Sequence, residues 1–268
     1  MTDMEAPADK ERMTEEEWRL FRSLDPARLP RHIAIIMDGN RRWAKGRNFP
    51  ALRGHQAGAK TTRRVIELCI DINLEVLTLY AFSTENWKRP HHEVEALMKL
   101  IEWNLRKELP ELKKSGVRVK HIGRREGLPP SLLNQLDRAV NETSMNDKMI
   151  LNLAVNYGGR GELTDAVRSI AADVSAGRLR IEEIDEETIA GSLYTAGQIE
   201  PDLLIRTGGE MRISNFLLWQ IAYTELWVTP VYWPDFQKAD LLRAIVDYQA
   251  RERLFGSSTD VSAERRGK

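Results

Sequence analysis

Short apolar runs alternate with segments of helical period along this chain, and this alternation constrains the fold more than any other feature. The apolar runs lie at 32–37, 76–82, 117–122, 149–155, 202–205 and 226–229. Several of them are almost wholly apolar, which is typical of strands buried on both faces of a sheet. Apolar residues recur with helical spacing at 94–105, 132–140 and 163–174. The pattern predicts an α/β fold: a single domain with a central, largely parallel six-stranded sheet wrapped by helices.

The two ends of the chain are polar and set the expected domain limits. Residues 1–30 form a polar lead-in, in which a short helix is expected at 15–24 before Pro26 and Pro30. Residues 257–268 contain almost nothing apolar to bury, so we expect a disordered tail. No internal repeat or low-complexity linker interrupts the stretch between them, which predicts one folded domain over 31–256.

Composition excludes several classes of protein. The 268 residues include 40 basic and 40 acidic side chains, so net charge gives no reason to expect nucleic acid as a partner. Cys69 lies among apolar residues and is expected in the core rather than as a reactive thiol. The charged N-terminus does not resemble a secretory signal, and no apolar run reaches the ~20 residues needed to span a bilayer. We expect a cytoplasmic protein, for which peripheral contact with a membrane surface stays open.

Polar segments follow most of the predicted strands. They read DGNRR from Asp38, STENW from Ser83, NYGGR from Asn156 and RTGGE from Arg206. In an open parallel sheet the carboxyl ends of all strands lie on one edge, where ligands bind. We therefore expect these loops to converge on one cleft.

Arginines gather on or just after these loops, at Arg41, Arg42, Arg89, Arg206 and Arg212. Guanidinium groups suit phosphate oxygens because they form paired hydrogen bonds, although any one arginine could instead be a solvated surface residue. Asp38 and Glu225 are carboxylates beside apolar strands, and a carboxylate among phosphate-binding arginines is a natural ligand for Mg²⁺. Taken alone, Asp38 could equally cap the following helix. The cluster as a whole favours a phosphate site.

One motif is a decoy. The stretch GHQAGAKTT at 54–62 nearly matches a nucleotide P-loop, but Ala59 replaces the second glycine and a loop precedes it where a strand is required. Among the histidines, His55 is placed to donate to a phosphate. The other histidines are expected to be solvated or structural, at His32, His91, His92 and His121. Because no nucleophile elbow is present, the phosphate itself is the expected leaving group.

Several long segments resemble the cis-prenyltransferases, especially bacterial undecaprenyl diphosphate synthase. They are HIAIIMDGNRRWAK, GHQAGA, LTLYAFSTENWKRP, NYGGRGE, DLLIRTGGEMRISNFLLWQIAYTEL and WPDF, in order from about residue 29 to 256. The resemblance implies a homodimer with a hydrophobic tunnel in each subunit and makes 31–256 the catalytic domain. It implies a Mg²⁺-dependent enzyme that condenses isopentenyl diphosphate onto an allylic diphosphate such as farnesyl diphosphate, each new double bond being cis. The implied product is undecaprenyl diphosphate, the lipid-carrier precursor for cell-wall polymers.

The resemblance also assigns roles to residues. Asp38 matches the family's Mg²⁺-binding aspartate, and Glu225 its second metal ligand. The allylic diphosphate site corresponds to Gly39, Asn40, Arg41, Arg42, His55 and Arg89. The isopentenyl diphosphate site corresponds to Arg206, Arg212, Ile213 and Ser214. The junction of the two sites corresponds to Trp43, Ser83, Thr84, Glu85 and Trp87.

Asn86 matches a residue that is often given the proton-accepting role in this family. A carboxamide is a very weak base, so we expect Asn86 to orient the substrate while a phosphate oxygen takes the proton. Two alternatives to the leading hypothesis stay open: the same chemistry with another product length, and a non-catalytic partner subunit. The second requires loss of active-site residues, and Asp38, Arg206, Arg212 and Glu225 are all present.

The chain departs from the family pattern at two positions. Ala51 stands where many relatives carry an arginine, for which Arg53 or the extra Arg41 could substitute, and Met211 stands where some have histidine. The apolar residues of 94–105 read as ordinary core packing, but the resemblance implies that part of this helix lines the tunnel. Ala81 is small and would not block a tunnel early, which favours a long product.

Overall fold

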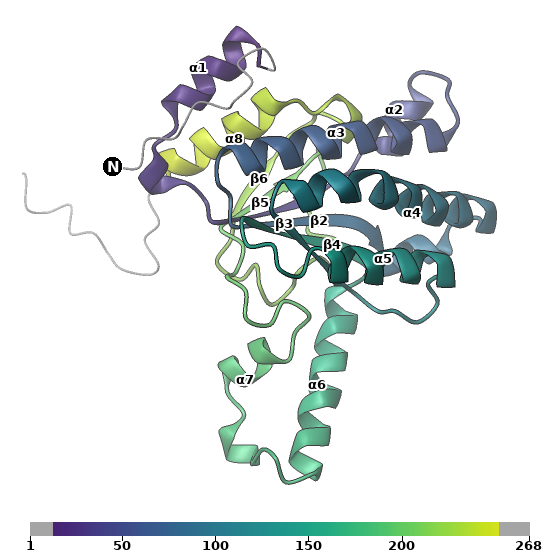
Figure 1. Ribbon diagram of the computed structural model, residues 1–268, viewed down its shortest axis with the longest axis vertical. Helices are drawn as coiled ribbons and strands as arrows, with labels where there is room; N and C mark the ends of the chain where they lie inside the picture. The colour runs from purple at the N-terminus through teal and green to yellow at the C-terminus, as the bar shows by residue number, and fades with distance from the viewer. Residues whose placement is uncertain (1–12, 252–268) are drawn as a thin grey trace, which may run out of the picture.

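A six-stranded, all-parallel sheet forms the centre of the molecule in the computed structural model, which describes residues 13–251 (Figure 1). The strand order is β3-β4-β2-β1-β5-β6. The strands are β1 (His32–Ile36), β2 (Val76–Ser83), β3 (Val117–Ile122), β4 (Met149–Tyr157), β5 (Leu203–Arg206) and β6 (Glu225–Val228). The expected α/β fold with a parallel six-stranded sheet is confirmed.

Helices and loops cover the two faces of the sheet differently. The helices are α1 (Glu15–Ser23), α2 (Asn40–Lys45), α3 (Ala51–Asp71), α4 (His91–Lys114), α5 (Pro130–Glu142), α6 (Gly159–Ser175), α7 (Glu186–Gly191) and α8 (Lys238–Ala250). The main core includes Ile33 and Ile35 of β1 with side chains of α3, α4, α5 and α8. The alternate residues Ala34 and Ile36 face a smaller core around Phe216. Figure 1 shows α6 and α7 extending away from this body.

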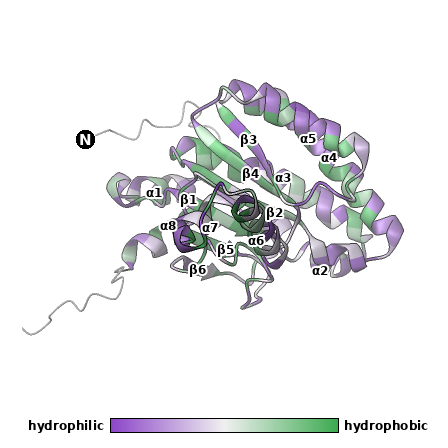
Figure 2. Ribbon diagram, turned by 90° about the horizontal axis from the view of Figure 1, so that it is seen from below, coloured by the Kyte–Doolittle hydropathy of each residue, from purple (hydrophilic) through white to green (hydrophobic). Residues whose placement is uncertain are grey.

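The predicted elements are present with small shifts at their ends. Each predicted strand is found within two residues of its expected limits, and the helices predicted at 94–105, 132–140 and 163–174 are longer than expected. The short helix at 15–24 is α1, whose Phe21 is buried in the main core. In Figure 2 the strands are mostly hydrophobic while the helices alternate between hydrophobic and hydrophilic residues. The predicted tail at 257–268 lies outside the described residues.

The apparent P-loop at 54–62 is helical throughout, because it forms the first half of α3. Its glycines serve the packing of α3 against α2. A Cβ on Gly54 would lie 2.0 Å from the carbonyl oxygen of Asn40, and a Cβ on Gly58 would lie 2.3 Å from the Oδ1 atom of the same residue. The nucleotide-binding interpretation is therefore excluded, since a P-loop is a loop that follows a strand.

The centre of the sheet brings two functional loops together. β1 pairs with β5 in a register that places Ile36 beside Arg206, so the residues just after these strands are neighbours. The chain leaves β1 towards β2 on one side and leaves β5 towards β6 on the other. Such a divergence opens a crevice at the carboxyl edge of a parallel sheet. Among residues 13–251, no helix combines the length and the apolar character needed to cross a membrane.

Candidate active site

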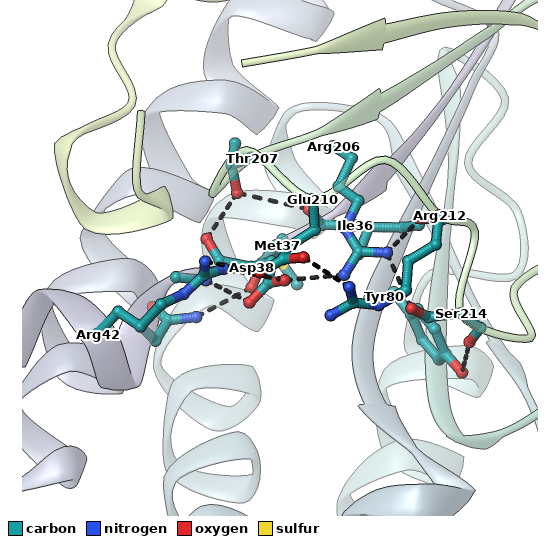
Figure 3. A network of polar contacts seen from close by, with 12 residues as sticks. Ile36, Met37, Asp38, Arg42, Tyr80, Arg206, Thr207, Glu210, Arg212 and Ser214 are labelled. Atoms are coloured by element: carbon teal, nitrogen blue, oxygen red, sulfur yellow. Dashed lines mark hydrogen bonds and ion pairs between the residues drawn. The ribbon is translucent and has the colours of Figure 1, made fainter. Parts of the chain in front are cut away.

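Asp38 lies just after β1, and two guanidinium groups hold its carboxylate (Figure 3). Arg206 Nη2 donates to Oδ2 over 2.9 Å, and Arg42 Nη2 lies 3.2 Å from the same oxygen. The backbone N–H of Gly39 donates to Oδ1 over 2.6 Å. Burial alone would raise the pKa of Asp38, but these hydrogen bonds and charges outweigh it and lower the pKa below its usual value. Asp38 is therefore an anion at neutral pH.

Gly39, and not Asp38, caps helix α2. Gly39 has a φ of +101°, a conformation that favours glycine, and a Cβ there would lie 2.6 Å from Tyr232 Cδ1. The side chain of Asp38 makes no capping hydrogen bond to the helix. Capping therefore does not explain why an aspartate stands at this position.

Arg206 ties the loop after β5 to the loop after β1. Its side chain is 6% exposed, and Nη1 donates to the carbonyl of Arg212 and, over 2.8 Å, to Ser214 Oγ. Thr207 Oγ1 donates to the carbonyl oxygen of Asp38 over 2.7 Å. Figure 3 shows these groups converging from the two strands. The orientation of Arg206 is thus fixed before any ligand binds.

Two further carboxylates each lie between two guanidinium groups. Glu210 Oε1 is 3.0 Å from Arg42 Nη1, and Glu210 Oε2 is 2.5 Å from Arg212 Nη1. Glu93 is 3.6 Å and 3.3 Å from two other guanidinium groups, those of Arg41 and Arg89. Each of these carboxylates, like that of Asp38, occupies a position that suits a phosphate oxygen.

These cations surround a polar pocket of about 680 Å³ beside Asp38. Its cationic lining residues are Arg41, Arg42, Lys45, Arg89 and Arg212, and His55 also lines it. The acidic side chains on the same wall are those of Asp38 and Glu210. Since the basic groups outnumber the acidic ones, the pocket is suited to a phosphate or diphosphate group.

Buried polar atoms without partners also point to a ligand. Within the described part of the chain, Asn40 Oδ1, His55 Nε2 and Arg206 Nε are buried and form no hydrogen bond. Buried polar groups are normally satisfied, so these three atoms have hydrogen-bonding capacity left for a polar ligand. Burial, with the charges of Arg89 and Arg41, lowers the pKa of His55 to about 4. The imidazole is therefore neutral and can donate through one ring nitrogen.

An apolar tunnel of about 650 Å³ continues from the polar pocket into the core. Both cavities are lined by Asp38, Asn40, His55 and Arg89, so they form one continuous space. The apolar walls are Ile66, Leu79, Ala81, Leu97, Leu100, Ile101, Leu105, Leu112, Leu151 and Leu153. A cavity with a cationic head and a long apolar body fits an amphiphile that carries a phosphate at one end.

Comparison with known proteins identifies the family. The family model described as "Putative undecaprenyl diphosphate synthase" matches residues 36–256. The isoprenyl transferase of Heliobacterium mobile is 51% identical over 250 residues, which cover 93% of this chain and 96% of the relative. The isoprenyl transferase of Geobacillus kaustophilus is also 51% identical, covering 85% of this chain and 89% of that protein. This chain belongs to the undecaprenyl diphosphate synthase family of cis-prenyltransferases.

Solved structures of prenyltransferases share the fold. Lavandulyl diphosphate synthase from Lavandula x intermedia, determined in complex with dimethylallyl diphosphate, aligns with a TM-score of 0.84 and 40% identity, covering 86% of this chain and 99% of that one. A probable undecaprenyl diphosphate synthase from Campylobacter jejuni aligns with a TM-score of 0.71 and 32% identity over 85% and 98% of the two chains. The protein is therefore a prenyltransferase enzyme of isoprenoid biosynthesis.

The apolar stripe on α4 of this prenyltransferase divides between tunnel and core. Leu97, Ile101 and Leu105 line the tunnel. Val94 and Met98 are buried in the main core and are not among the tunnel-lining residues of the described chain. Both interpretations of the stripe are thus correct, each for a different part of it.

The residues expected at the junction of the two sites also divide. Ser83, Glu85 and Asn86 line the tunnel near Ser214, and Asn86 Oδ1 accepts a hydrogen bond of 3.1 Å from the backbone N–H of Ser83. Within the described chain, three other residues expected at the junction do not line either cavity, and nor does Ile213 of the expected isopentenyl diphosphate site: Trp43, Thr84 and Trp87. Their contact with substrate stays a prediction.

The two tryptophans of this group have hydrogen-bond partners that do not line either cavity of the described chain. Trp43 Nε1 donates to Asp235 over 2.7 Å, and Trp87 Nε1 donates to Asn156 over 2.7 Å. Neither tryptophan lines the tunnel of the described chain, and these hydrogen bonds fix the position of both indoles. Thr84 donates instead to Glu85 over 3.3 Å.

The structure does not bring Glu225 to Asp38. Glu225 begins β6 and pairs with Leu203 at the start of β5, whereas Asp38 lies beyond the carboxyl end of β1. Its carboxylate instead forms an ion pair of 2.7 Å with Arg251. Glu225 lies at the amino end of the parallel strands and Asp38 lies beyond their carboxyl end. The expectation that the two carboxylates share one metal ion is therefore not met within one chain.

The structure locates the two residues, Ala51 and Met211, at which the chain departs from the family pattern. Ala51 lines the polar pocket, as does Arg41, whereas Arg53 faces a separate groove between α3 and α4. Of the two expected substitutes for a missing arginine, Arg41 is the one at the pocket. Met211 is 82% exposed.

Sequence reasoning missed Lys45, Glu210 and Asn215. Lys45 lies one helical turn after Arg41, so the spacing in α2 could have placed it on the pocket. Glu210 and Asn215 carried no such signal, because their roles depend on distant partners. Asn215 Nδ2 donates to Glu85 over 2.9 Å and its carbonyl accepts from Gly159, joining segments far apart in the sequence.

Proposed function

We propose that this enzyme is a Mg²⁺-dependent synthase of a long-chain cis-polyprenyl diphosphate, most specifically undecaprenyl diphosphate for cell-wall lipid carriers. The observation that carries the proposal is the continuity of the cationic pocket with the apolar tunnel. A prenyl diphosphate has this same division between a charged head and an apolar chain. Elongation requires two substrates, each with a diphosphate group, to bind next to each other. The basic groups lie on two sides of Asp38, as this requires.

The two substrates take different sides of Asp38 in this proposal. The allylic diphosphate, with farnesyl diphosphate as primer, binds the α2 side through the Gly39–Arg42 turn, His55 and Arg89, and its chain enters the tunnel. Isopentenyl diphosphate binds the side after β5, through Arg206, Arg212 and Ser214. Asp38 lies between them, in contact with both Arg42 and Arg206.

The residues fit Mg²⁺ bound partly through substrate. Among residues 13–251, no group of three or more histidine, cysteine or acidic side chains could enclose a metal ion. Mg²⁺ is commonly held by one or two carboxylates together with substrate phosphates, and Asp38 supplies an ionised carboxylate beside the pocket. When bound, the ion would neutralise charge on the departing diphosphate.

The remaining chemistry falls to the side chains of the pocket. Arginines aimed at the diphosphate stabilise the negative charge that develops as the allylic C1–O bond breaks and the isopentenyl double bond attacks C1. Asn86 orients the reacting chain, because its Oδ1 already accepts from Ser83 and a carboxamide is a poor base. A phosphate oxygen then takes the proton that the new intermediate loses.

Product length and assembly belong to the same proposal. The tunnel passes along α4 from Leu97 to Leu112, a distance of about 22 Å at ~1.5 Å per residue, and this supports a long chain. A different product is the main alternative, since the lavender relative is named for a lavandulyl product. We further propose a homodimer, because Val167, Tyr223 and Leu226 are exposed on α6 and around the edge strand β6.

The test is an elongation assay with purified protein. Farnesyl diphosphate and labelled isopentenyl diphosphate are supplied with and without Mg²⁺, and the products are sized by chromatography. We expect long cis-polyprenyl products with Mg²⁺, and a loss of rate of about 10²-fold or more in Asp38→Ala. No elongation by the parent enzyme would refute the proposal, and a single short product would refute the undecaprenyl assignment.

A further inference from the structure

A broad groove runs between α3 and α4 on the outside of the tunnel wall. Its volume is about 1270 Å³, and it shares Ala59, Leu100 and Asn104 with the tunnel. The groove therefore borders the apolar interior, where the tail of a long chain would lie. The side chains that line the groove are typical neither of a protein core nor of an ordinary solvated surface.

Large aromatic side chains are exposed on this groove. Trp103 of α4 is 54% exposed, and Phe49, just before α3, is 51% exposed. Exposing such side chains to water is unfavourable, and a cluster of them commonly marks an interaction surface. Tryptophan in particular is favoured where an apolar phase meets water, because its ring is apolar and its N–H is polar.

Basic side chains surround these aromatic residues. Lys99, Trp103 and Lys107 succeed one another at intervals of four residues, so they form one stripe along α4. Lys107 Nζ lies 5.1 Å from the centre of the Trp103 ring. Across the groove α3 contributes Arg53 and Lys60.

The charge of the groove is strongly one-sided. Arg53, Lys60, Lys99 and Lys107 have no ion-pair partner within residues 13–251. The acidic lining residue, Glu108, is engaged by Arg63 at 3.6 Å. Lysine and arginine can bury their methylene stems while their charged ends reach phosphate groups.

We propose that this groove, defined by Phe49, Arg53, Lys60, Lys99, Trp103 and Lys107, docks the enzyme on the surface of an anionic phospholipid bilayer. The aromatic rings enter the interface and the basic groups contact lipid phosphates. The surface lies beside the tunnel, so docking places the apolar interior next to the membrane. Binding itself follows from the groove alone and does not depend on the proposed product.

Cosedimentation of the full-length protein with vesicles, without substrates, tests the proposal. Vesicles of phosphatidylcholine alone are compared with vesicles containing one third phosphatidylglycerol, at low and high salt. We expect binding to the anionic vesicles that weakens with salt, because exposed charges are screened. Equal binding to both compositions would overturn the proposal.

Matched charge reversals locate the surface. Each basic group near an anionic membrane contributes about fivefold in affinity, so Lys99→Glu/Lys107→Glu should weaken binding about 25-fold or more. Trp103→Ala should weaken it severalfold. The control Arg19→Glu/Lys148→Glu makes the same change in charge on exposed residues of α1 and of the turn before β4, and should change binding less than about twofold. An equal loss in the control would contradict the assignment.

Two further measurements keep the outcomes distinct. The rate of a single condensation without vesicles should be unchanged in the groove variants. That result would show that the variants fold and that their defect lies in binding to the membrane. Light scattering reports the oligomeric state of each variant. If the groove variants alter subunit association, the groove is an interface between copies of the chain and the membrane proposal is wrong.

Discussion

Ala51 leaves a gap in the basic wall of the polar pocket, and Arg41 lies on the same wall. A charge-assisted hydrogen bond is worth about 1.5–3 kcal/mol, so Arg41→Ala should raise the KM for the allylic diphosphate about 10- to 100-fold. Ala51→Arg, which restores a guanidinium group to this wall, should recover part of that loss in the double variant. Steady-state kinetics with each substrate varied in turn measure both effects. If Ala51→Arg leaves the KM of Arg41→Ala unchanged, the two positions do not serve one phosphate.

His55 makes stability depend on pH. Burial holds its pKa near 4, below the ordinary value of 6.5, so the unfolded chain binds the proton more tightly. The stabilisation is therefore complete above about pH 6.5 and is lost as the pH falls towards 4. The loss at about pH 5 is on the order of 1–2 kcal/mol for such a histidine. His32, whose pKa burial also lowers to about 4, adds to the same trend.

Urea unfolding at a series of pH values checks this expectation. His55→Gln should lose less stability than the parent between neutral pH and pH 5, because one titrating group is gone. His92→Gln changes an exposed histidine at the start of α4 and serves as the matched control. An identical pH dependence in the parent and His55→Gln would contradict the assignment to His55.

Individual side chains show how far the candidate site could be predicted. The types and spacing of Asp38, Arg42 and Arg206 were sufficient, because the loops after parallel strands all lie at the carboxyl edge of the sheet. The direction of Trp43 was not predictable, since its partner Asp235 lies nearly two hundred residues away. The position of Glu225, at the other end of the strands from Asp38, was not predictable, because a motif reports a residue's neighbours in sequence and not the end of the strand on which it lies.

Among the elements, the contact between α2 and α3 decides the shape of the polar pocket. A Cβ on Gly58 would meet Asn40 Oδ1 at 2.3 Å and Trp233 Cδ1 at 2.7 Å. Gly58→Ala should therefore destabilise the fold by about 1–3 kcal/mol and raise the KM for the allylic substrate, since Asn40 must move. Gly191→Ala, in α7 with nothing within 4 Å of its Cβ, should be neutral or slightly stabilising. Urea unfolding compares the two, and equal effects would show that the crowding around Gly58 is not limiting.

The wall between β2 and α4 should control product length. Ala81 lines the tunnel, so Ala81→Leu adds bulk there and should shift products towards shorter chains while the first condensation continues. Met98→Leu replaces one side chain by another of similar volume. Because Met98 lies in the core behind the tunnel wall, this control should leave the length distribution unaltered. Chromatography of labelled products measures both. An unchanged distribution in Ala81→Leu would mean that growing chains do not pass this position.

The elements themselves were predicted to different degrees. Strands such as β1 were clear because they are buried on both faces and therefore nearly continuous in apolar residues. The glycines in the first half of α3 resemble a phosphate-binding loop in sequence, and their role in packing against Asn40 depends on neighbours in space that the sequence does not give. The resemblance implied that part of the α4 stripe lines the tunnel, but which of its residues do so was not predictable, because both environments demand the same apolar side chains.

At the scale of the whole molecule, β6 leaves one edge of the sheet unpaired within the described chain. Open edges invite pairing with another chain, and Leu226 and Tyr223 expose apolar surface beside this one. Leu226→Arg should convert the proposed dimer into a monomer, as measured by light scattering across a range of concentrations. Ile181→Arg, on an exposed residue of the short 3-10 helix (Ile181–Glu183) that follows α6, is the matched control and should leave the mass unchanged. A parent protein that is monomeric at every concentration would refute the dimer.

The carboxylates between paired arginines have a consequence for the catalytic cycle as a whole. Asp38, Glu93 and Glu210 act as internal counter-ions in the positions proposed for substrate phosphates. They reduce the electrostatic repulsion among the cations of the pocket. Each incoming diphosphate must then displace an anion already in place, and binding becomes an exchange rather than a simple addition. In the proposed reaction the affinity should therefore be lower than the number of arginines suggests, so that pyrophosphate can leave after every condensation.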